Sequence, residues 1–181
     1  MDLRIQKTKS SIKAAFLELR GQKHLERITV KELAEKAMIN KATFYTHYED
    51  IYDLQDQLED EAVMNAIKQM PHPEYLHSDP KEGTKELTRE MIAKKDIFDA
   101  IFKNGREHYF SEKIDRHVKN FIYEEYPSYR ENVKVNALLT VLTYGCFTAY
   151  MRYNTEKIED VIEVIGDVND RLKDLYDEYM Q

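Results

Sequence analysis

Residues 40–48 combine small, hydroxyl-bearing and aromatic side chains at a spacing that suits contact with double-stranded DNA. Asn40 is a favourable N-cap, and a helix from Lys41 to Tyr48 turns Phe44 toward a protein core. Small and polar groups on the opposite side let such a helix approach base edges in the major groove. The outward side chains predicted for this role are Lys41, Ala42, Thr43, Thr46 and His47.

Three hydroxyl groups are candidates for contacts with phosphate oxygens. Tyr45 and Tyr48 extend from the same predicted helix, whereas Thr29 lies at the start of the preceding one, beside backbone N–H groups that no helical bond uses. Contacts of this kind position a protein on a duplex without reading its sequence. The DNA-binding residues predicted are therefore Thr29, Asn40, Lys41, Ala42, Thr43, Tyr45, Thr46, His47 and Tyr48.

A plainer interpretation of the same residues stays open. The tyrosines can be part of the core, Thr29 can be only a helix cap, and His47 can be a surface histidine, because helical spacing is also what a core produces.

These residues need a framework of short helices to position them. Apolar residues at i, i+3, i+4 and i+7 from Ile12 predict a first helix, and residues 20–27 are expected to form a loop. Thr29 followed by Glu32 is a capping box that starts a short second helix. The second and third helices are joined by a tight turn, which predicts a helix-turn-helix. Asp50 is expected to cap a fourth helix.

The charge distribution favours the same segment for contact with a polyanion. The net charge is −7, yet residues 1–48 hold ten Lys and Arg against five Asp and Glu, whereas the rest hold 17 against 29. A basic head on an acidic body is expected to meet DNA with the head alone.

Gly and Pro are scarce and the apolar residues recur at helical spacing, so we predict an all-α protein. Pro71, Pro73 and Pro80 lie within ten residues and mark a boundary. We expect a helix-turn-helix DNA-binding domain over residues 1–50 and an effector-binding and dimerisation domain over 51–181. Helices of the body are expected from Asp79-Pro80, over 97–102 with a stop at Asn104-Gly105, over 110–122, behind a capping box of Ser128 with Glu131, and over 158–179.

A heptad-like seam on the last helix and a long apolar run before it, in which Gly145 permits close approach, suit a four-helix dimer interface. The alternative is that both helices are the body's own core. The interface residues predicted are Leu138, Leu142, Gly145, Ile158, Val161, Ile165, Val168, Leu172 and Leu175.

The head also carries a recognisable pattern. Ile28-Thr29-Val30 is followed by Leu33, Ala34 and Ala37, by NKATFYTHY over residues 40–48, and by Leu54. Over residues 8–58 the chain resembles the TetR family of bacterial transcriptional regulators. The resemblance implies an all-helical homodimer with an amino-terminal DNA-binding head and a divergent ligand-binding body, whose last two helices pair across the two-fold axis.

The chain departs from this family at one position. Members commonly carry a lysine at the start of the fourth helix that meets a phosphate, but here Ile51 stands there, flanked by Glu49, Asp50 and Asp53. We therefore expect weaker or more salt-sensitive DNA binding. The cations expected to compensate are Lys7, Lys9, Lys13 and Lys41.

Aromatic and polar residues of the body are candidates for an effector cavity that suits an apolar or aromatic small molecule, although packed core is the alternative. The effector-binding residues predicted are Phe98, Phe102, His108, Tyr109, His117, Phe121, Asn136, Thr140, Tyr144 and Phe147.

Several protein classes are not expected. A single cysteine and a charged amino end without an apolar stretch indicate a cytoplasmic protein, and residues 135–151 are too polar for a clean membrane span. The sequence has no glycine-rich phosphate loop, no G-x-S-x-G and no H-E-x-x-H, and its histidines lack metal-ligand spacing. We expect neither an enzyme, a cofactor nor a metal site.

Together these features predict a homodimeric regulator of transcription that binds a pseudo-palindromic operator in double-stranded DNA. The resemblance implies repression, with release by a small-molecule effector that acts through residues 50–70. One alternative is an activator whose body docks a protein partner instead of a small ligand. Another is a small helical enzyme of unrecognised type.

Overall fold

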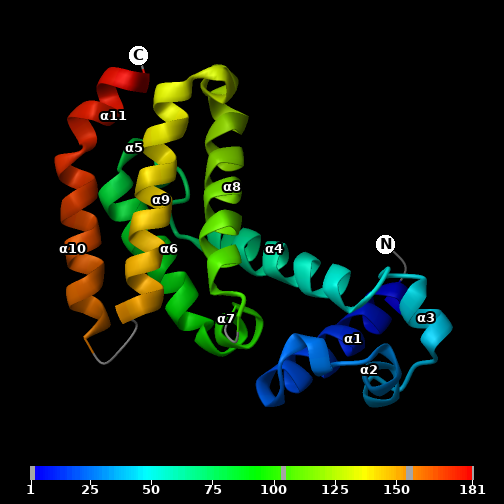
Figure 1. Cartoon of the computed structure of the whole chain (residues 1–181). Helices are drawn as coiled ribbons and strands as arrows, with labels where there is room; N and C mark the ends of the chain where they lie inside the picture. Colours follow the sequence, from blue (N-terminus) through cyan, green and yellow to red (C-terminus); the bar gives the residue numbers. More distant parts are fainter. Residues whose placement is uncertain (1–2, 103–104, 154–156, 181) are drawn as a thin grey trace. The chain divides into compact units, whose positions relative to one another are not determined.

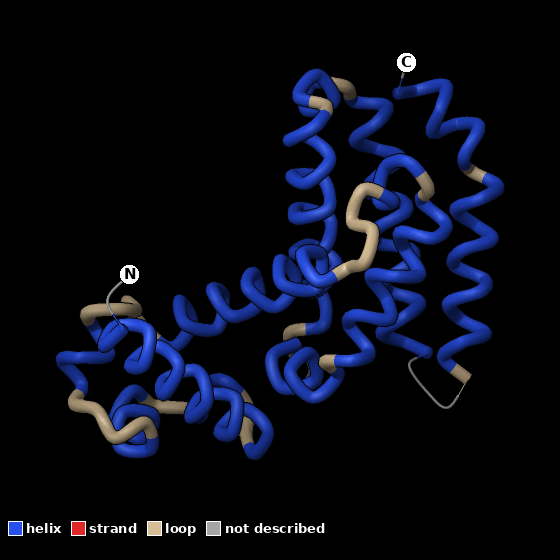
Figure 2. The backbone as a smooth tube through the Cα atoms, turned by 180° about the vertical axis from the view of Figure 1, so that it is seen from behind, coloured by secondary structure: helices blue, strands red, loops and turns tan. Residues whose placement is uncertain are grey.

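The structure, a computed structural model, describes residues 3–102, 105–153 and 157–180. Over these ranges the chain is all-α, as predicted, and contains no strand (Figure 1, Figure 2). The elements are α1 (Leu3–Gln22), the 3₁₀ turn η1 (Leu25–Arg27), α2 (Val30–Lys36), α3 (Lys41–Tyr45), α4 (Ile51–Gln69), α5 (Tyr75–Ser78), α6 (Pro80–Ala93), α7 (Lys95–Phe102), α8 (Glu107–Glu125), the 3₁₀ turn η2 (Pro127–Glu131), α9 (Val133–Tyr153), α10 (Ile158–Arg171) and α11 (Lys173–Met180).

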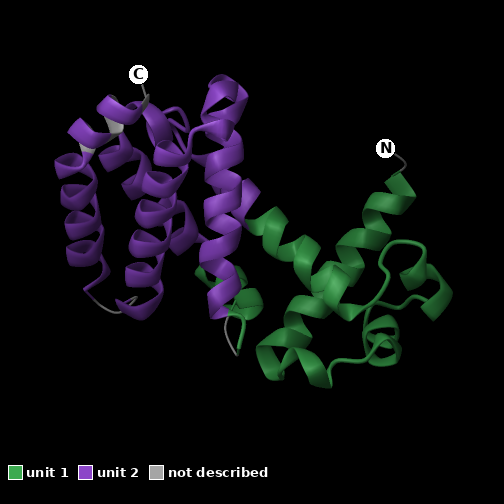
Figure 3. Ribbon diagram, turned by 45° about the horizontal axis from the view of Figure 1, so that its top comes forward, with its two compact units in different colours: residues 1–62, 95–106 green, residues 63–94, 107–181 purple. Residues whose placement is uncertain are grey.

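The chain forms two compact units, coloured separately in Figure 3. Unit 1 comprises Met1–Ala62 and Lys95–Arg106, and unit 2 comprises Val63–Lys94 and Glu107–Gln181. Helix α7 thus belongs to the same unit as the three amino-terminal helices, because it packs against α1. These units reflect packing, and the functional division at residue 50 stays a prediction.

The core of unit 1 is built from the apolar stripes that the sequence predicts. Ile12 and Phe16 of α1 are completely buried, as are Leu33 of α2, Phe44 of α3 and Leu54 of α4. Each of these four helices therefore contributes at least one large side chain to a shared core, which supplies the stability that the short helices α2 and α3 lack alone.

Local capping explains where three of these elements start. Thr29 Oγ1 accepts a hydrogen bond from the backbone N–H of Glu32, and Asn40 Oδ1 accepts one from that of Thr43. Asp50 Oδ1 accepts from the backbone N–H groups of Tyr52 and Asp53. All three predicted caps are confirmed.

Two predicted boundaries in unit 1 are wrong. Residues 20–27 are not a simple loop, because α1 continues to Gln22 and buried Leu25 anchors the turn η1. The third helix ends at Tyr45 rather than Tyr48. Thr46 Oγ1 donates to the carbonyl of Thr43 and so satisfies one of the last helical acceptors, which closes the helix early.

Unit 2 is built around α6, α8, α9 and α10. Helix α6 packs against α10, and α9 lies between α8 and α10 (Figure 1). The predicted start at Asp79-Pro80 is confirmed, since Asp79 Oδ1 accepts from the backbone N–H of Glu82. Phe110 of α8 contacts Phe147 of α9, with ring centroids 6.0 Å apart and the rings edge to face.

Two expectations about the ends of helices in unit 2 are wrong. Ser128 and Glu131 do not cap a helix, because they lie in η2; the cap of α9 is Asn132, whose Oδ1 accepts from two backbone N–H groups. The last helix is not continuous over 158–179 but is broken at Leu172. The break lets α11 pack on α9, where Asn132 Nδ2 donates to the carbonyl of Tyr179.

The expected helix stop after residue 102 is described only in part. Asn104 lies outside the described residues. Gly105 has a φ of +92°, a conformation that favours glycine, and α8 starts two residues later at Glu107.

Candidate nucleic-acid interface

The candidate interface lies in unit 1, where α2 and α3 are joined by a short turn. Phe44 anchors α3, since its side chain is completely buried and its ring centroid lies 5.6 Å from that of Tyr48. With this anchor inside, the other side of α3 faces outward. Met38 in the turn has a φ of 55°, which is unusual for a residue with a branched or long side chain, and it is 92% exposed.

Most of the predicted DNA-binding residues lie on the outward side of α3 and at the start of α2. Tyr45 is 57% exposed, and Lys41, Ala42 and Thr46 are exposed as well. Thr29 and Asn40 are exposed caps. Thr43 and His47 are half-buried beside them. The structure therefore brings these eight residues to two neighbouring short helices that pack together.

Tyr48 lies in a different environment from the other predicted contacts. It is only 3% exposed, and burial, followed by the negative charges of Glu61 and Asp53, raises the pKa of its phenol to about 12. The Nζ of Lys9 lies over its ring, 5.8 Å from the centroid. Tyr48 thus belongs to the core of the unit, as the plainer interpretation of its spacing held.

Position 51, where the family resemblance predicts a lysine, is also buried. Ile51 is 6% exposed, so its side chain is part of the core. The acidic residues around it serve the backbone: Asp50 caps α4, and Asp53 Oδ2 accepts from the N–H of Glu49. The start of α4 therefore presents no cation.

The amino-terminal part of α1 lies beside α3, a relationship that the sequence analysis missed. Together they form an open groove of about 500 Å³. It is lined by Arg4, Ile5, Thr8 and Lys9 of α1 and by Thr43, Thr46 and His47. More than 30 residues separate the two walls along the chain, so no local pattern indicates this contact.

The four lysines expected to compensate for Ile51 have different surroundings. Lys9 lines the groove, and Lys41 and Lys7 are exposed outside its lining. Lys13 forms an ion pair with Glu61. Its charge is thereby neutralised within the unit, and Lys13 no longer suits the expected role.

The comparisons with known proteins agree with a regulator. No family model matches the chain. Part of it is similar to a helix-turn-helix regulator. The chain is 27% identical over 117 residues to the uncharacterized HTH-type transcriptional regulator YxbF of Bacillus subtilis (strain 168), and the match covers 60% of this chain. The chain covers 30% of the length of that protein.

The predicted effector residues are divided between the two units. Phe98 and Phe102 belong to unit 1, where they are buried and stack with centroids 5.9 Å apart. The other eight residues lie in unit 2. There, His108 is exposed, Tyr144 is 40% exposed, and Thr140 accepts a hydrogen bond from Lys119 Nζ. Tyr109, His117, Phe121 and Asn136 are half-buried.

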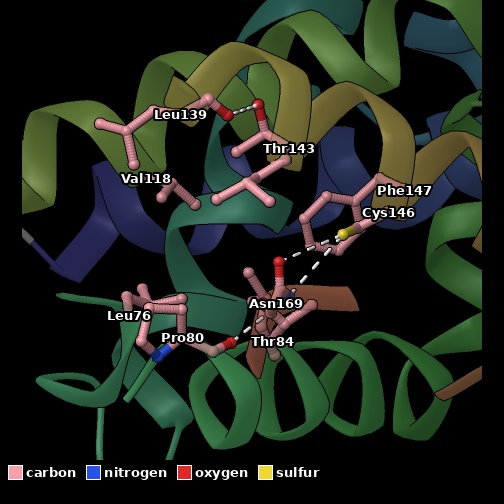
Figure 4. Close-up of a pocket in the computed structure, with 11 residues that line it drawn as sticks. Leu76, Pro80, Thr84, Val118, Leu139, Thr143, Cys146, Phe147 and Asn169 are labelled. Atoms are coloured by element: carbon pink, nitrogen blue, oxygen red, sulfur yellow. Dashed lines mark hydrogen bonds between the residues drawn. The ribbon is translucent and has the colours of Figure 1, made fainter. Parts of the chain in front are cut away.

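Unit 2 contains a small cavity of about 30 Å³ between α5, α6, α8, α9 and α10 (Figure 4). Of the predicted effector residues, Phe147 lines it. Asn169, 2% exposed, projects into this region, and its Nδ2 donates to Thr84 Oγ1 at 2.8 Å. Cys146 Sγ lies 3.9 Å from Asn169 Oδ1. The remaining lining residues are Leu76, Pro80, Leu87, Val118, Leu139, Leu142 and Thr143.

The predicted interface residues divide between the inside and the outside of unit 2. Ile165 is 5% exposed and thus packs within the unit's own core. Val168, Leu175 and Gly145 are exposed. The intermediate positions are Leu138, Leu142, Ile158, Val161 and Leu172.

Two features are absent from the residues that the structure describes. Among them, no three His, Cys, Asp or Glu side chains are grouped so that they would hold a metal ion. None of the helices in the described ranges has the length and apolar character needed to cross a membrane.

Proposed function

We propose that this chain is a DNA-binding regulator of transcription whose helix α3 enters the major groove. The observation that carries the proposal is the exposure of Lys41, Ala42, Tyr45 and Thr46 on a short helix that is anchored from behind by buried Phe44. Small and hydrogen-bonding side chains on an anchored helix are what groove contact requires. The likeness to a protein described as an HTH-type transcriptional regulator supports the same function.

Two kinds of contact with DNA are expected, to base edges and to phosphates. Lys41 and His47 are the candidates for base edges and adjacent phosphates, and Thr43 and Thr46 are candidates for base edges. Thr29 at the start of α2 and the hydroxyl of Tyr45 are candidates for phosphates alone. Ala42 permits close approach. Tyr48, being buried, positions α3 through Phe44 instead of touching DNA.

We further propose that the protein acts as a homodimer on a pseudo-palindromic operator. Helices α9 and α10 pack against each other, and both carry exposed apolar side chains. Val141 and Tyr144 of α9 are 65% and 40% exposed, and Val164 and Val168 of α10 are 62% and 45% exposed. A second copy that covers these side chains would bury them in a four-helix bundle, and the two-fold symmetry would match paired half-sites.

We also propose that the protein represses transcription and that an apolar or aromatic effector releases it from its operator. The cavity of unit 2 is mainly apolar and contains polar groups at Asn169 and Thr84, which is the character of a small-molecule site. Its volume of about 30 Å³ is far below the ~300 Å³ of a typical ligand pocket, so helices around it must separate before an effector enters.

The same small volume favours a second candidate function. A regulator whose body docks a protein partner needs no large cavity, and such a protein would activate transcription. A screen of apolar and aromatic compounds distinguishes the two: an effector raises the melting temperature and lowers the affinity for DNA, whereas neither change is expected for a body that docks a protein.

Selection of bound fragments from genomic DNA with the purified protein tests the central proposal. We expect enrichment of a sequence with two-fold symmetry, and the variants K41A and Y45A should weaken its binding while the oligomeric state is unchanged. Absence of enrichment at low salt, or wild-type affinity in both variants, would contradict the role of α3.

A further inference from the structure

The groove between α1 and α3 suits a second set of contacts with DNA, an inference that rests on the proposed function. We infer that Arg4 and Lys9 bind phosphates of one strand of the duplex in this groove, while the exposed residues of α3 contact the same duplex. Both cations line the groove, whereas the start of α4 presents no cation, because Ile51 is buried there.

The chemistry of the groove suits an anion. Its lining has two permanent cations, Arg4 and Lys9, and the histidine His47, and it includes no carboxylate. A polyanion that lies along α3 therefore meets positive charge on its α1 side. Charged contacts of this kind are the main source of affinity for the DNA backbone.

The hydroxyl groups of the groove cannot supply the same attraction, because their protons are already used. Thr8 Oγ1 donates to the carbonyl of Arg4 at 2.9 Å, and Thr46 Oγ1 donates to that of Thr43 at 2.7 Å. Thr43 Oγ1 donates to Asn40 Oδ1 at 2.9 Å. Binding of a phosphate therefore depends on the guanidinium and the ammonium group.

The surroundings of Lys9 hold it in place for this role. Its ammonium group lies over the ring of buried Tyr48, 5.8 Å from the centroid, and this ring is fixed by Phe44. A cation held over an aromatic face loses less conformational freedom on binding than a mobile surface lysine. The same core residue that anchors α3 thus also positions Lys9.

The neighbouring lysines of α1 provide matched controls. Lys7 is exposed but does not line the groove. Lys13 is paired with Glu61. Each change to alanine removes one positive charge from α1, so K7A and K13A separate a local contact from a general effect of net charge.

The experiment measures binding of a fluorescent duplex against salt concentration for the full-length protein. Two probes are used: a duplex recovered by selection from genomic DNA and a 30-base-pair duplex of random sequence. The logarithm of affinity falls linearly with the logarithm of salt concentration, with a slope of about 0.9 for each phosphate contact.

We expect R4A/K9A to flatten this slope by about 2 for each bound head, so that the loss of affinity between 50 and 200 mM salt shrinks about tenfold for each bound head. The flattening should be the same on both probes, because phosphates carry no sequence. K7A and K13A should leave the slope unchanged, and K9R should retain the wild-type value.

Other results overturn the inference. An unchanged slope in R4A/K9A, or an equal flattening in K7A, would show that the groove is not a phosphate site, while the proposed function would stand as long as K41A weakens binding. Wild-type protein that binds neither probe at low salt would refute the proposed function itself. Helical content measured by circular dichroism verifies that every variant is folded.

Discussion

Arg106 forms a two-fold hydrogen-bonded ion pair with Glu59: its Nε and Nη2 each donate to a carboxylate oxygen at 2.8 Å. Glu59 is completely buried in α4, and its Oε1 also accepts from Gln55 Nε2 at 2.7 Å. Gln55 Nε2 donates in turn to the carbonyl of Ile101 in α7. The network joins α4 to α7 and to the segment that follows it, within unit 1.

Arg106→Ala is expected to lower the free energy of unfolding by about 3–5 kcal/mol, because it leaves a buried carboxylate without its cation. The double variant E59L/R106L should recover most of this loss, since it removes both charges. Urea denaturation followed by circular dichroism measures both. A loss below about 1 kcal/mol in R106A would contradict the role of the pair.

Gly83→Ala is expected to destabilise unit 2. A Cβ at this position would lie 2.5 Å from the backbone carbonyl carbon of Tyr75 and 2.6 Å from the backbone nitrogen of Leu76, so α5 must move away from α6. We expect a net loss of about 1–3 kcal/mol in thermal unfolding.

Gly21→Ala is the matched control for this change. It also lies in a helix, but nothing lies within 4 Å of its added Cβ, so the higher helix propensity of alanine should raise stability by up to about 1 kcal/mol. Equal effects of the two substitutions would show that the contact between α5 and α6 is looser than described.

Met38→Gly should stabilise the turn between α2 and α3. The φ of 55° at Met38 is costly for a residue with a Cβ, and the 92% exposed side chain contributes little packing. Glycine adopts this conformation freely, so we expect a gain of up to about 1 kcal/mol in chemical denaturation. The low helix propensity of glycine does not reduce this gain, because residue 38 lies outside both helices. A loss of stability in M38G would contradict the strain assigned to this turn.

Val164→Glu is expected to weaken the proposed dimer at least about 100-fold, because an unpaired charge buried in an interface costs about 3 kcal/mol or more. Sedimentation equilibrium measures the change. Val133→Glu is the control: Val133 is 80% exposed at the start of α9, outside the proposed interface, and its replacement should leave association unchanged. A wild-type monomer, or a V164E dimer of unchanged affinity, would refute this interface.

The thiol of Cys146 should react slowly with iodoacetamide in the folded protein. Burial raises its pKa from 9.0 to about 11, so the thiolate fraction at pH 8 is about 100-fold smaller than in the unfolded chain. The raised pKa also means that the thiol stabilises the fold fully below pH 9, and this contribution is lost as the pH rises toward 11.

The rate of alkylation, followed by mass spectrometry with and without guanidinium chloride, tests this prediction. N169A removes the amide beside the sulfur and should speed the reaction of the folded protein by opening the cavity. Equal rates in native and denaturing buffer would contradict a buried thiol.

The predictions from sequence succeeded where one short segment contains the whole interaction. The caps at Thr29, Asn40, Asp50 and Asp79 each bind a backbone N–H within three residues, so the chemistry is visible in the local pattern. The apolar stripe of α1 is likewise a property of one helix. The helical class and the outward side of α3 follow from such signals.

The remaining features depend on residues far apart in the chain. Tyr48 and Ile51 are buried, and Glu59 pairs with Arg106. Lys9 lies over the ring of Tyr48, whereas Lys13 pairs with Glu61. All of these features result from the way helices pack in three dimensions. Lys9 and Lys13 lie four residues apart and so share a face of α1, because helical periodicity states which residues share a face but not which neighbour covers each of them. Only packing determines that neighbour.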